Sequence, residues 1–366
     1  MSFALLEIRR AALKYGLLAA AVALLVFLVL FLWTLSGALI RSFIGTLEAA
    51  ELDVLVYSEQ ARDNVQASRL EPDVVEAVAA VDGVSAAAPW STTTLTGELD
   101  GEPSDLGLFG IDPQGPGAPA GLTDGRLPTA LDETAVDAGG QAQIGDLIVL
   151  RPSGIELKVV GLLRGAQFLA QPTAFVDQAT FDEVTRAANP EVPFVPINAV
   201  AVTTDAGTDP GVVAQRVEDT VPGVTAYTKR AAVDAVPGVD QVGSTFAILI
   251  AVTFLIAVVV VGFFFLILTV QKQRVFTLLR ALGDPPHRLA AGLALQITAV
   301  VAVASVIAVG VTALAIAGLN TGIPVSLSPQ RVAIVVAAVL AFSLLAGMAS
   351  VSRIARLDPA AAAGAR

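Results

Sequence analysis

The chain has 366 residues, of which 55% are hydrophobic and 15% charged, and its mean hydropathy is +0.73. This composition is too apolar for an ordinary soluble protein and predicts a membrane protein. The chain has no cysteine, which excludes disulfides, thiol chemistry, cysteine-based zinc sites and a lipid-modified cysteine.

The N-terminal segment combines apolar and basic residues. Residues 1–15 place Arg9, Arg10 and Lys14 among apolar side chains, which predicts a cytoplasmic amphipathic helix on the inner leaflet. This helix either only sets the topology or also binds a partner. The apolar segment that follows, 16–40, exceeds the roughly 7–15 residues of a signal-peptide core, so we expect a retained first transmembrane helix.

A long segment of different composition follows, and we expect residues 41–243 to form an α+β domain. Residues 112–125 are rich in proline and glycine, and we expect a boundary between two subdomains there. Alternating β-branched residues on both sides of Pro152–Gly154 predict a β-hairpin over 144–163. Further predicted strands are 52–57, 95–99, 106–111 and 199–203, and the predicted helices are 71–78, 180–188 and 209–221.

A short pattern occurs twice in this domain. Val81-Asp82-Gly83-Val84 follows one predicted helix, and Val221-Pro222-Gly223-Val224 follows another. A helix, a glycine and a strand beginning with valine therefore recur, which predicts one α+β element that is repeated.

The C-terminal part is again apolar. Three segments are long enough to cross a hydrocarbon core, which needs roughly 20 residues. We therefore predict an α-helical membrane protein with four transmembrane helices and the α+β domain between the first two. The later segments are a second span 244–270, a loop 271–288, a third span 289–318, a turn 319–329, a fourth span 330–351 and a tail 352–366.

The charges are distributed asymmetrically. Residues 41–244 hold 30 of the 33 acidic residues and 11 of the 22 basic ones, a net charge of −19. The flanks 1–16, 271–288 and 352–366 hold ten bases and three acids. By the positive-inside rule, both termini and the loop are cytoplasmic and the α+β domain is extracytoplasmic. We expect a bacterial cytoplasmic membrane, and the acidic domain excludes nucleic-acid binding.

The residues needed for several kinds of chemistry are missing. The predicted spans have no Asp, Glu, Lys or His in their interiors, which argues against ion-coupled transporters and channels. No lysine lies in a Walker A setting, so the chain cannot bind ATP through a P-loop. The single histidine, His287, is expected at the inner membrane face. We therefore expect no catalytic, cofactor or metal site, and a domain that binds or transmits motion.

The loop between the second and third spans has a helical pattern. Val275, Leu278, Leu279 and Leu282 form one apolar stripe, and Gly283 before Asp-Pro-Pro marks the helix end. The segment is either a solvated turn or a surface on which another protein acts.

Three features together resemble the FtsX-like/MacB-like permease family, the membrane subunits of type VII ABC transporters. They are the loop 272–283 (KQRVFTLLRALG), the tail 353–360 (RIARLDPA), and the motifs Gly110-Ile111-Asp112, Gly125-Arg126-Leu127-Pro128 and Ile144-Gly145-Asp146. The resemblance covers nearly the whole chain. One departure is Val275, where the family usually has an acidic residue.

The resemblance implies a permease dimer, homomeric or heteromeric, in which each copy binds a separate cytoplasmic ATPase subunit that holds ATP and magnesium. It implies that the loop is the docking surface for that subunit, with the N-terminal helix as a secondary contact. The implied docking residues are Arg274, Phe276, Leu278, Leu279, Arg280 and Gly283. Gly262 and Gly310 would permit close helix packing in the bundle or the dimer.

The family resemblance implies ATP-driven motion of the extracytoplasmic domain, for export or extraction of a hydrophobic or amphiphilic molecule, a lipid, a lipoprotein or a peptide. An extracytoplasmic adaptor is a further implied partner. An alternative is a regulator that transports nothing and controls an extracellular cell-wall hydrolase. A membrane-anchored ligand receptor is disfavoured, because the tail from Ser352 is too short for an output domain.

Overall fold

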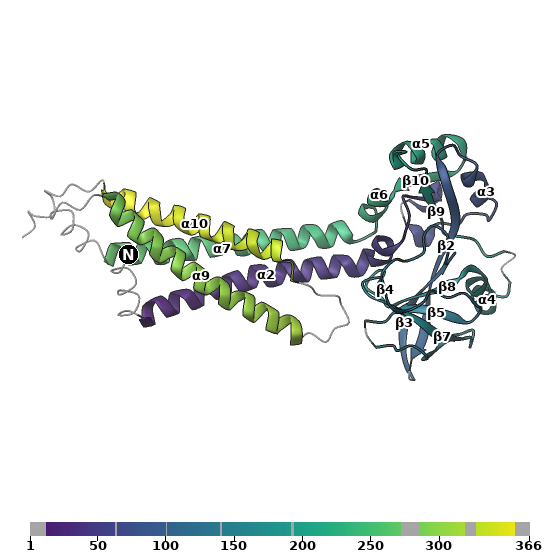
Figure 1. Cartoon of the computed structure of the whole chain (residues 1–366), viewed down its shortest axis with the longest axis horizontal. Coiled ribbons are helices and arrows are strands. Elements are labelled where there is room, and N and C mark those ends of the chain that lie inside the picture. Colours follow the sequence, from purple (N-terminus) through teal and green to yellow (C-terminus); the bar gives the residue numbers. More distant parts are fainter. Residues whose placement is uncertain are drawn as a thin grey trace, which may run out of the picture. The chain divides into compact units, whose positions relative to one another are not determined.

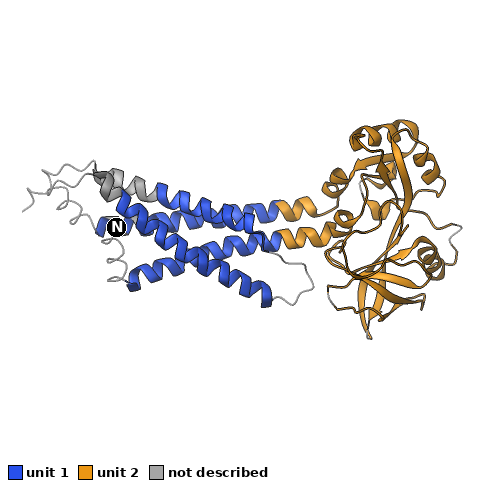
Figure 2. Ribbon diagram, viewed as in Figure 1, with its two compact units in different colours: residues 1–36, 244–319, 325–366 blue, residues 37–243, 320–324 orange. Residues whose placement is uncertain are grey.

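The computed structural model describes residues 12–62, 64–99, 101–139, 141–191, 194–271, 286–318 and 327–355. The chain divides into two compact units, which Figure 2 distinguishes by colour. We call residues 1–36, 244–319 and 325–366 the membrane unit, and residues 37–243 with 320–324 the α+β domain.

The long helices in Figure 1 are α2 (Ala12–Ala49), α7 (Val239–Gln271), α9 (Pro286–Gly318) and α10 (Pro329–Ala355). Three segments are long and apolar enough to cross a membrane, namely Ala12–Ala49, Val239–Phe264 and Ala291–Gly318. In α10 the apolar segment among the described residues is Pro329–Leu345, which is shorter. The structure therefore supports three of the four predicted spans, and the fourth stays a prediction.

The helices of the membrane unit pack through small and β-branched side chains. In α2 the buried face repeats every three or four residues, with Tyr15, Leu18, Val22, Val26 and Val29, as one side of a helix requires. This face belongs to a core that includes residues of α7, α9 and α10. The same helices expose large apolar side chains on their other faces, which suits contact with lipid.

The first lobe of the α+β domain is a four-stranded antiparallel sheet in the order β10-β1-β9-β2. In sequence, β1 (Val54–Ser58) is followed by α3 (Val74–Ala79) and β2 (Val84–Leu99). Later β9 (Ala199–Thr204) is followed by α5 (Pro210–Thr220) and β10 (Val224–Thr228). This order of elements is the β-α-β-β-α-β arrangement of ferredoxin-like folds.

The two halves of this lobe are the repeated element that the sequence predicts. A turn leads from α3 into β2 and another from α5 into β10, and both glycines have positive φ, 96° at Gly83 and 77° at Gly223. Both helices pack on one face of the sheet, where Val78 and Val217 are fully buried. The repeat thus reflects two equivalent helix-to-strand connections that cover the same core.

The second lobe lies in the chain between β2 and β9. Its strands are β3 (Glu102–Ile111), β4 (Leu122–Gly125), β5 (Glu133–Asp137), β6 (Leu147–Arg151), β7 (Glu156–Leu163) and β8 (Thr173–Asp177). The second half of β2 pairs with β3, and the pairing continues through β8, β5, β7 and β6 back to β2. These six strands therefore close a small barrel, which has no free edge along this ring.

The change from one lobe to the other occurs within β2 and not at 112–125. The strand pairs with β9 up to Trp90 and with β3 from Ser91 onward. Residues 112–125 instead form a loop followed by β4, and Gly117 and Ala118 exchange backbone hydrogen bonds with Glu51. One continuous strand serves both lobes, so a composition change in a loop does not mark their boundary.

The predicted hairpin over 144–163 is confirmed, because β6 and β7 pair in antiparallel register from Leu147 opposite Lys158. The helix α4 (Gln178–Ala188) and α5 agree closely with their predicted ranges. The span predicted to end at residue 40 continues as α2 to Ala49, and α7 begins at Val239, before its predicted start.

Candidate functional site: the ends of α2 and α7 in the α+β domain

The predicted docking residues lie outside the described part of the chain. Arg274, Phe276, Leu278, Leu279, Arg280 and Gly283 all belong to the loop between Gln271, where α7 ends, and Pro286, where α9 begins. The backbone of His287 lies in the first turn of α9. Docking of an ATPase on this loop therefore stays a prediction.

The two glycines predicted for helix packing differ in their surroundings. Gly262 is half-buried in α7. Gly310 is exposed in α9, and a Cβ added there would meet nothing within 4 Å. Within the described part of the chain no other helix therefore packs closely on Gly310, and its role at a dimer contact stays a prediction.

A site that the sequence did not reveal is the last part of α2, Gly37–Ala49, which belongs to the α+β domain. This part of the helix passes very close to the segment 165–170. A Cβ added at Gly45 would overlap the carbonyl oxygen of Gly165 and lie 2.9 Å from that of Gln167. Only glycine allows this approach of backbone to backbone.

Hydrogen bonds fix the helix along the same segment. The backbone N–H of Thr46 donates to the Gln167 carbonyl at 3.0 Å, and the N–H of Ala170 donates to the Ser42 carbonyl at 2.8 Å. Thr46 and Ser42 are both fully buried. Backbone groups of a helix usually bond within the helix itself. Here α2 cannot slide along its axis unless these two bonds to the loop break.

Ala166 connects this segment to the barrel. Its carbonyl accepts hydrogen bonds from the hydroxyls of Thr46 and of Thr173, the first residue of β8. Its N–H donates at 2.7 Å to Oδ2 of Asp137, the last residue of β5, whose side chain is buried. The end of α2 is thus bound to two barrel strands through one short loop.

The C-terminus of α2 is held from the start of α6 (Lys229–Asp234). The Lys229 ammonium donates to the carbonyls of Glu48 at 3.0 Å and Ala50 at 2.6 Å, where a cation also complements the helix dipole. Ile44 and Leu47 of α2 share a core with Ala232 and Val236, which directly precede α7. The C-terminal end of α2 and the segment that leads into α7 are therefore fixed in the same core of the domain.

The three short motifs in this domain form turns and a fixed loop. Gly145 has φ 100° in the turn before β6, and the Asp146 carboxylate accepts the N–H of Gln143 at 2.7 Å. The Asp112 carboxylate likewise accepts the N–H of Gln114. These glycines and aspartates explain the local backbone, and none of these contacts forms a reactive arrangement.

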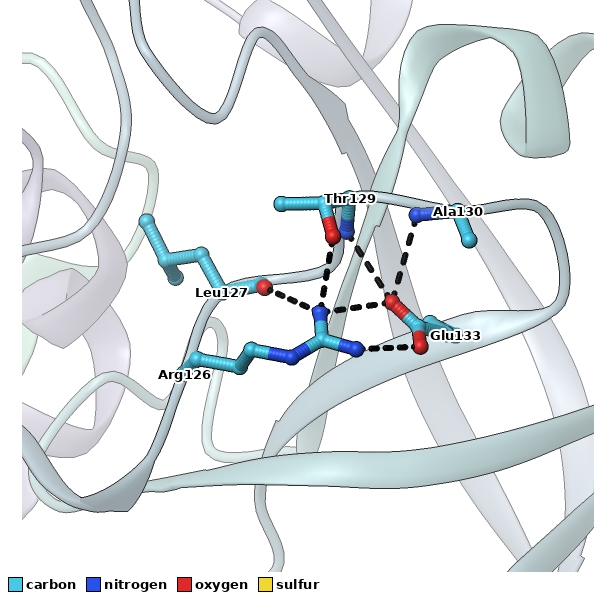
Figure 3. A network of polar contacts seen from close by, with 5 residues as sticks. All are labelled: Arg126, Leu127, Thr129, Ala130 and Glu133. Atoms are coloured by element: carbon cyan, nitrogen blue, oxygen red, sulfur yellow. Dashed lines mark hydrogen bonds and ion pairs between the residues drawn. The ribbon is translucent and has the colours of Figure 1, made fainter.

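Arg126 of the second motif joins a network with Glu133 that fixes the loop before β5, as Figure 3 shows. The guanidinium donates two hydrogen bonds to the Glu133 carboxylate and further bonds to Thr129 Oγ1 and the Leu127 carbonyl. The N–H groups of Thr129 and Ala130 donate to the same carboxylate. These donors, Arg126 first, lower the pKa of Glu133 from 4.5 to about 2.

Among the described residues there is no group of three or more His, Asp or Glu side chains that could hold a metal ion. The arrangement found is a helix that begins in the membrane unit and ends under several bonds in the α+β domain. This is the architecture of a membrane subunit that carries a large α+β domain between its first two apolar helices.

Comparisons with known proteins agree with this class. The family model described as MacB-like periplasmic core domain matches residues 16–220, and that described as FtsX-like permease C-terminal matches residues 247–359. The chain belongs to the FtsX-like/MacB-like permease family, because the first of these models alone covers more than half of it.

Its relatives include ABC transporter permeases from Mycobacterium tuberculosis. Rv0072 is 27% identical over 87% of this chain and 86% of its own length, and Rv2563 is 28% identical over 78% and 77%. A putative hemin transport system permease, HrtB of Staphylococcus haemolyticus, is 20% identical over 100% of this chain and 99% of its own length.

Two solved structures resemble part of the chain. The extracellular domain of the ABC-type transporter YknZ from Gram-positive bacteria has a TM-score of 0.36 and 13% identity, covering 48% of this chain and 98% of that one. The periplasmic region of MacB from Actinobacillus actinomycetemcomitans has a TM-score of 0.38 and 10% identity, covering 52% and 96%.

Proposed function

We propose that the chain is the membrane subunit of an ABC transporter that works by transmitting motion to its α+β domain. In this proposal, a separate cytoplasmic ATPase binds the loop 271–288, and two permease copies act together. The chain lies in a bacterial cytoplasmic membrane with both termini inside and the α+β domain outside. The charge distribution supports this orientation, because the acidic residues concentrate in the domain and the basic ones in the flanks.

The observation that carries the proposal is the fixation of α2. The helix runs without interruption from Ala12 to Ala49, and its last part is bonded to the barrel through Thr46, Ala166 and Asp137. A flexible linker would absorb a displacement of the span, whereas a continuous helix with a bonded end passes it on. The ends of α7 and α2 share one core, so both helices adjoining the domain act on the same place.

The proposed cargo is a hydrophobic or amphiphilic molecule, a lipid, a lipoprotein or a peptide. The name of one relative refers to hemin, an amphiphilic molecule. The described interior of the membrane unit supports this class as well, because its buried polar residues are only Thr, Ser and Gln, which do not suit transport of a charged solute through the bundle.

The proposal is tested by co-expressing the chain with a candidate ABC ATPase encoded beside it and purifying the complex. We expect the Arg274→Glu, Leu279→Asp double variant to lose co-purification and stimulated ATPase activity, because both changes lie on the predicted docking surface. Arg331→Glu, at the start of α10, is the matched control and should leave both unchanged.

Two results would contradict the proposal. If the double variant still co-purifies and keeps full ATPase activity, the loop is only a connector between helices. If no ABC ATPase associates with the wild-type chain, the chain is not an ABC permease subunit and a ligand receptor becomes the better interpretation.

A further inference from the structure

The two ends of the barrel of the α+β domain differ in what covers them. The helix α4 follows β8 and covers one end, where Phe181 and Val184 of α4 are buried in the barrel core. At the opposite end, β2, β5 and β7 finish and β3, β6 and β8 begin, as their pairing requires. The last part of α2 contacts this second end at Ala166 and Gln167, and a cavity remains beside the ends of β2, β3 and β6.

A cavity of about 430 Å³ opens at this second end, which we call the barrel mouth. The volume lies within the range of roughly 300–1,000 Å³ that small-molecule sites occupy, and barrel mouths are a common place for such sites. The cavity is lined mainly by apolar residues from five strands or their ends: Gly97, Leu99, Pro103, Leu106, Val136, Ala138, Ile148 and Pro172, with Glu102, Ser104 and Gln141 as the polar members.

Gly97 makes the room in this cavity. It lies in β2 opposite Ser104 of β3. Having no side chain, it leaves space between the side chains of Leu106 and Ile148. A Cβ added there would lie 3.0 Å from Leu106 Cδ2 and 3.3 Å from Ile148 Cγ2. Any larger residue at this position would therefore occupy the space that the two apolar side chains border.

The charged group of the mouth is Glu102. Alternate residues of a strand face the same side, so Glu102 and Ser104 face the side of Leu106 and Leu108, which are buried in the barrel core. Glu102 itself is exposed. Among the described residues that line the cavity there is no base, and Glu102 is the one acid.

We propose that the barrel mouth binds a small cationic amphiphile. Its apolar part occupies the space between Leu99, Leu106 and Ile148, and its ammonium group lies beside the Glu102 carboxylate. The net charge of −19 over residues 41–244 favours a cationic ligand over an anionic one through the long-range field. This inference does not depend on the proposed function, because the site needs neither the ATPase nor transport.

The experiment uses the full chain in lipid nanodiscs with 13C-labelled isoleucine δ1 methyl groups. Heptylamine, heptanol and heptanoate are titrated as probes that share one alkyl chain and differ in charge. We expect the Ile148 methyl signal to shift and saturate, with heptylamine binding most tightly and heptanoate least tightly. The methyl of Ile111, buried in a different core, should not follow the titration.

Variants separate the cavity from the charge. Gly97→Val should weaken all three probes at least about tenfold, because loss of a three-carbon space removes much of the apolar contact. Glu102→Gln should weaken heptylamine alone, by about two- to fivefold, as expected for an exposed ion pair. Asp105→Asn is the matched control, because Asp105 lies on the same strand but on its other face.

Three outcomes would overturn the proposal. The first is that Ile148 shows no saturable shift with any probe. The second is that Gly97→Val responds like the wild type, which would mean that the probes act through the lipid. The third is that heptylamine keeps its preference over heptanol in Glu102→Gln, which would remove the assigned partner of the ammonium group.

Discussion

The membrane unit and the α+β domain satisfy their buried polar groups in different ways. In the membrane unit, three buried hydroxyls donate to carbonyls four residues earlier in the same helix. The three pairs are Thr34 with Leu30, Thr312 with Ala308 and Ser343 with Val339, and the Tyr15 hydroxyl of α2 also donates to Gln296 Oε1 of α9 at 3.4 Å. In the α+β domain, buried polar side chains join segments that are far apart in sequence, such as Asn198, which bonds to Thr92 and Ser68.

This difference predicts which parts of the molecule can move independently. The helices of the membrane unit can shift against one another, whereas the segments of the α+β domain must move together. A hydroxyl bonded within its own helix keeps its partner when that helix shifts against its neighbours, whereas a shift of α2 against α9 would break only the long bond between Tyr15 and Gln296 among the described side-chain bonds. A side chain that bonds two distant segments loses its partners when those segments separate, and a buried group without a partner is costly. We therefore expect the helices to shift and the domain to move as one body.

The largest effect is expected from Gly45→Ala, because the new Cβ would overlap the Gly165 carbonyl. Overpacking against backbone should destabilise the domain by about 3 kcal/mol. The chain has two tryptophans, Trp33 and Trp90, so Trp90 fluorescence in a Trp33→Phe background reports thermal unfolding of the domain. Gly16→Ala in the same helix meets nothing within 4 Å and should be neutral or stabilising. Equal Tm values for the two variants would contradict the close approach of α2.

The next largest effect is expected from Asn198→Ala. Asn198 is buried, and its Oδ1 accepts the Thr92 N–H at 2.7 Å while its Nδ2 donates to the Ser68 carbonyl at 3.1 Å. The alanine leaves two backbone groups without partners and should cost about 2–3 kcal/mol. Thermal unfolding followed by Trp90 fluorescence checks this cost. A loss of stability no larger than that of a surface substitution would show that the domain does not depend on such long-range bonds.

A smaller and pH-dependent effect is expected from Glu133→Gln. The pKa of Glu133 is lowered from 4.5 to about 2 by Arg126 and two backbone N–H groups, so the carboxylate stabilises the fold fully above pH 4.5. That contribution is lost as the pH falls from 4.5 towards 2. The Tm difference between wild type and variant should therefore be full at pH 7 and shrink over this interval. A difference that persists unchanged at pH 2 would contradict the assignment.

The smallest effect is expected from Thr312→Val in α9. Thr312 is fully buried, and among the described residues its hydroxyl bonds only to the carbonyl of Ala308, one turn away. The nearly isosteric valine should change stability by about 0.5 kcal/mol or less, measured as loss of helicity during titration with sodium dodecyl sulfate. A cost as large as that of Asn198→Ala would end the distinction between the two units.

Much of the architecture follows from the sequence. Hydropathy alone locates the long helices, because an apolar run of that length has few other interpretations. The hairpin around Pro152–Gly154 and the repeated Gly83 and Gly223 turns were predicted because each depends on a local backbone requirement. The family was predicted from the loop 272–283, the tail 353–360 and three short motifs in the α+β domain.

Features that depend on distant contacts could not be predicted. The first half of β2 reads Val-Ser-Ala-Ala-Ala-Pro-Trp and shows no alternation, because its alanines pair with β9 in a sheet that the local sequence does not specify. That residues 41–49 continue α2 as a helix within the domain could not be predicted from their own sequence. The contact at Gly45 depends on Gly165, which lies 120 residues further on.

The position of the barrel within the chain has a consequence for how this domain can vary. Trp90 and Ala199 are directly opposite each other in the β2–β9 pair, and all the barrel strands from β3 to β8 lie between them in the chain. The barrel lobe is thus an insertion in the ferredoxin-like lobe. The chain leaves the ferredoxin-like lobe after Trp90 and returns to it at Ala199, which is paired with Trp90. Lengthening, shortening or exchanging that insertion during evolution changes no connection in the remaining lobe, and differences in length between family members should concentrate between these two positions.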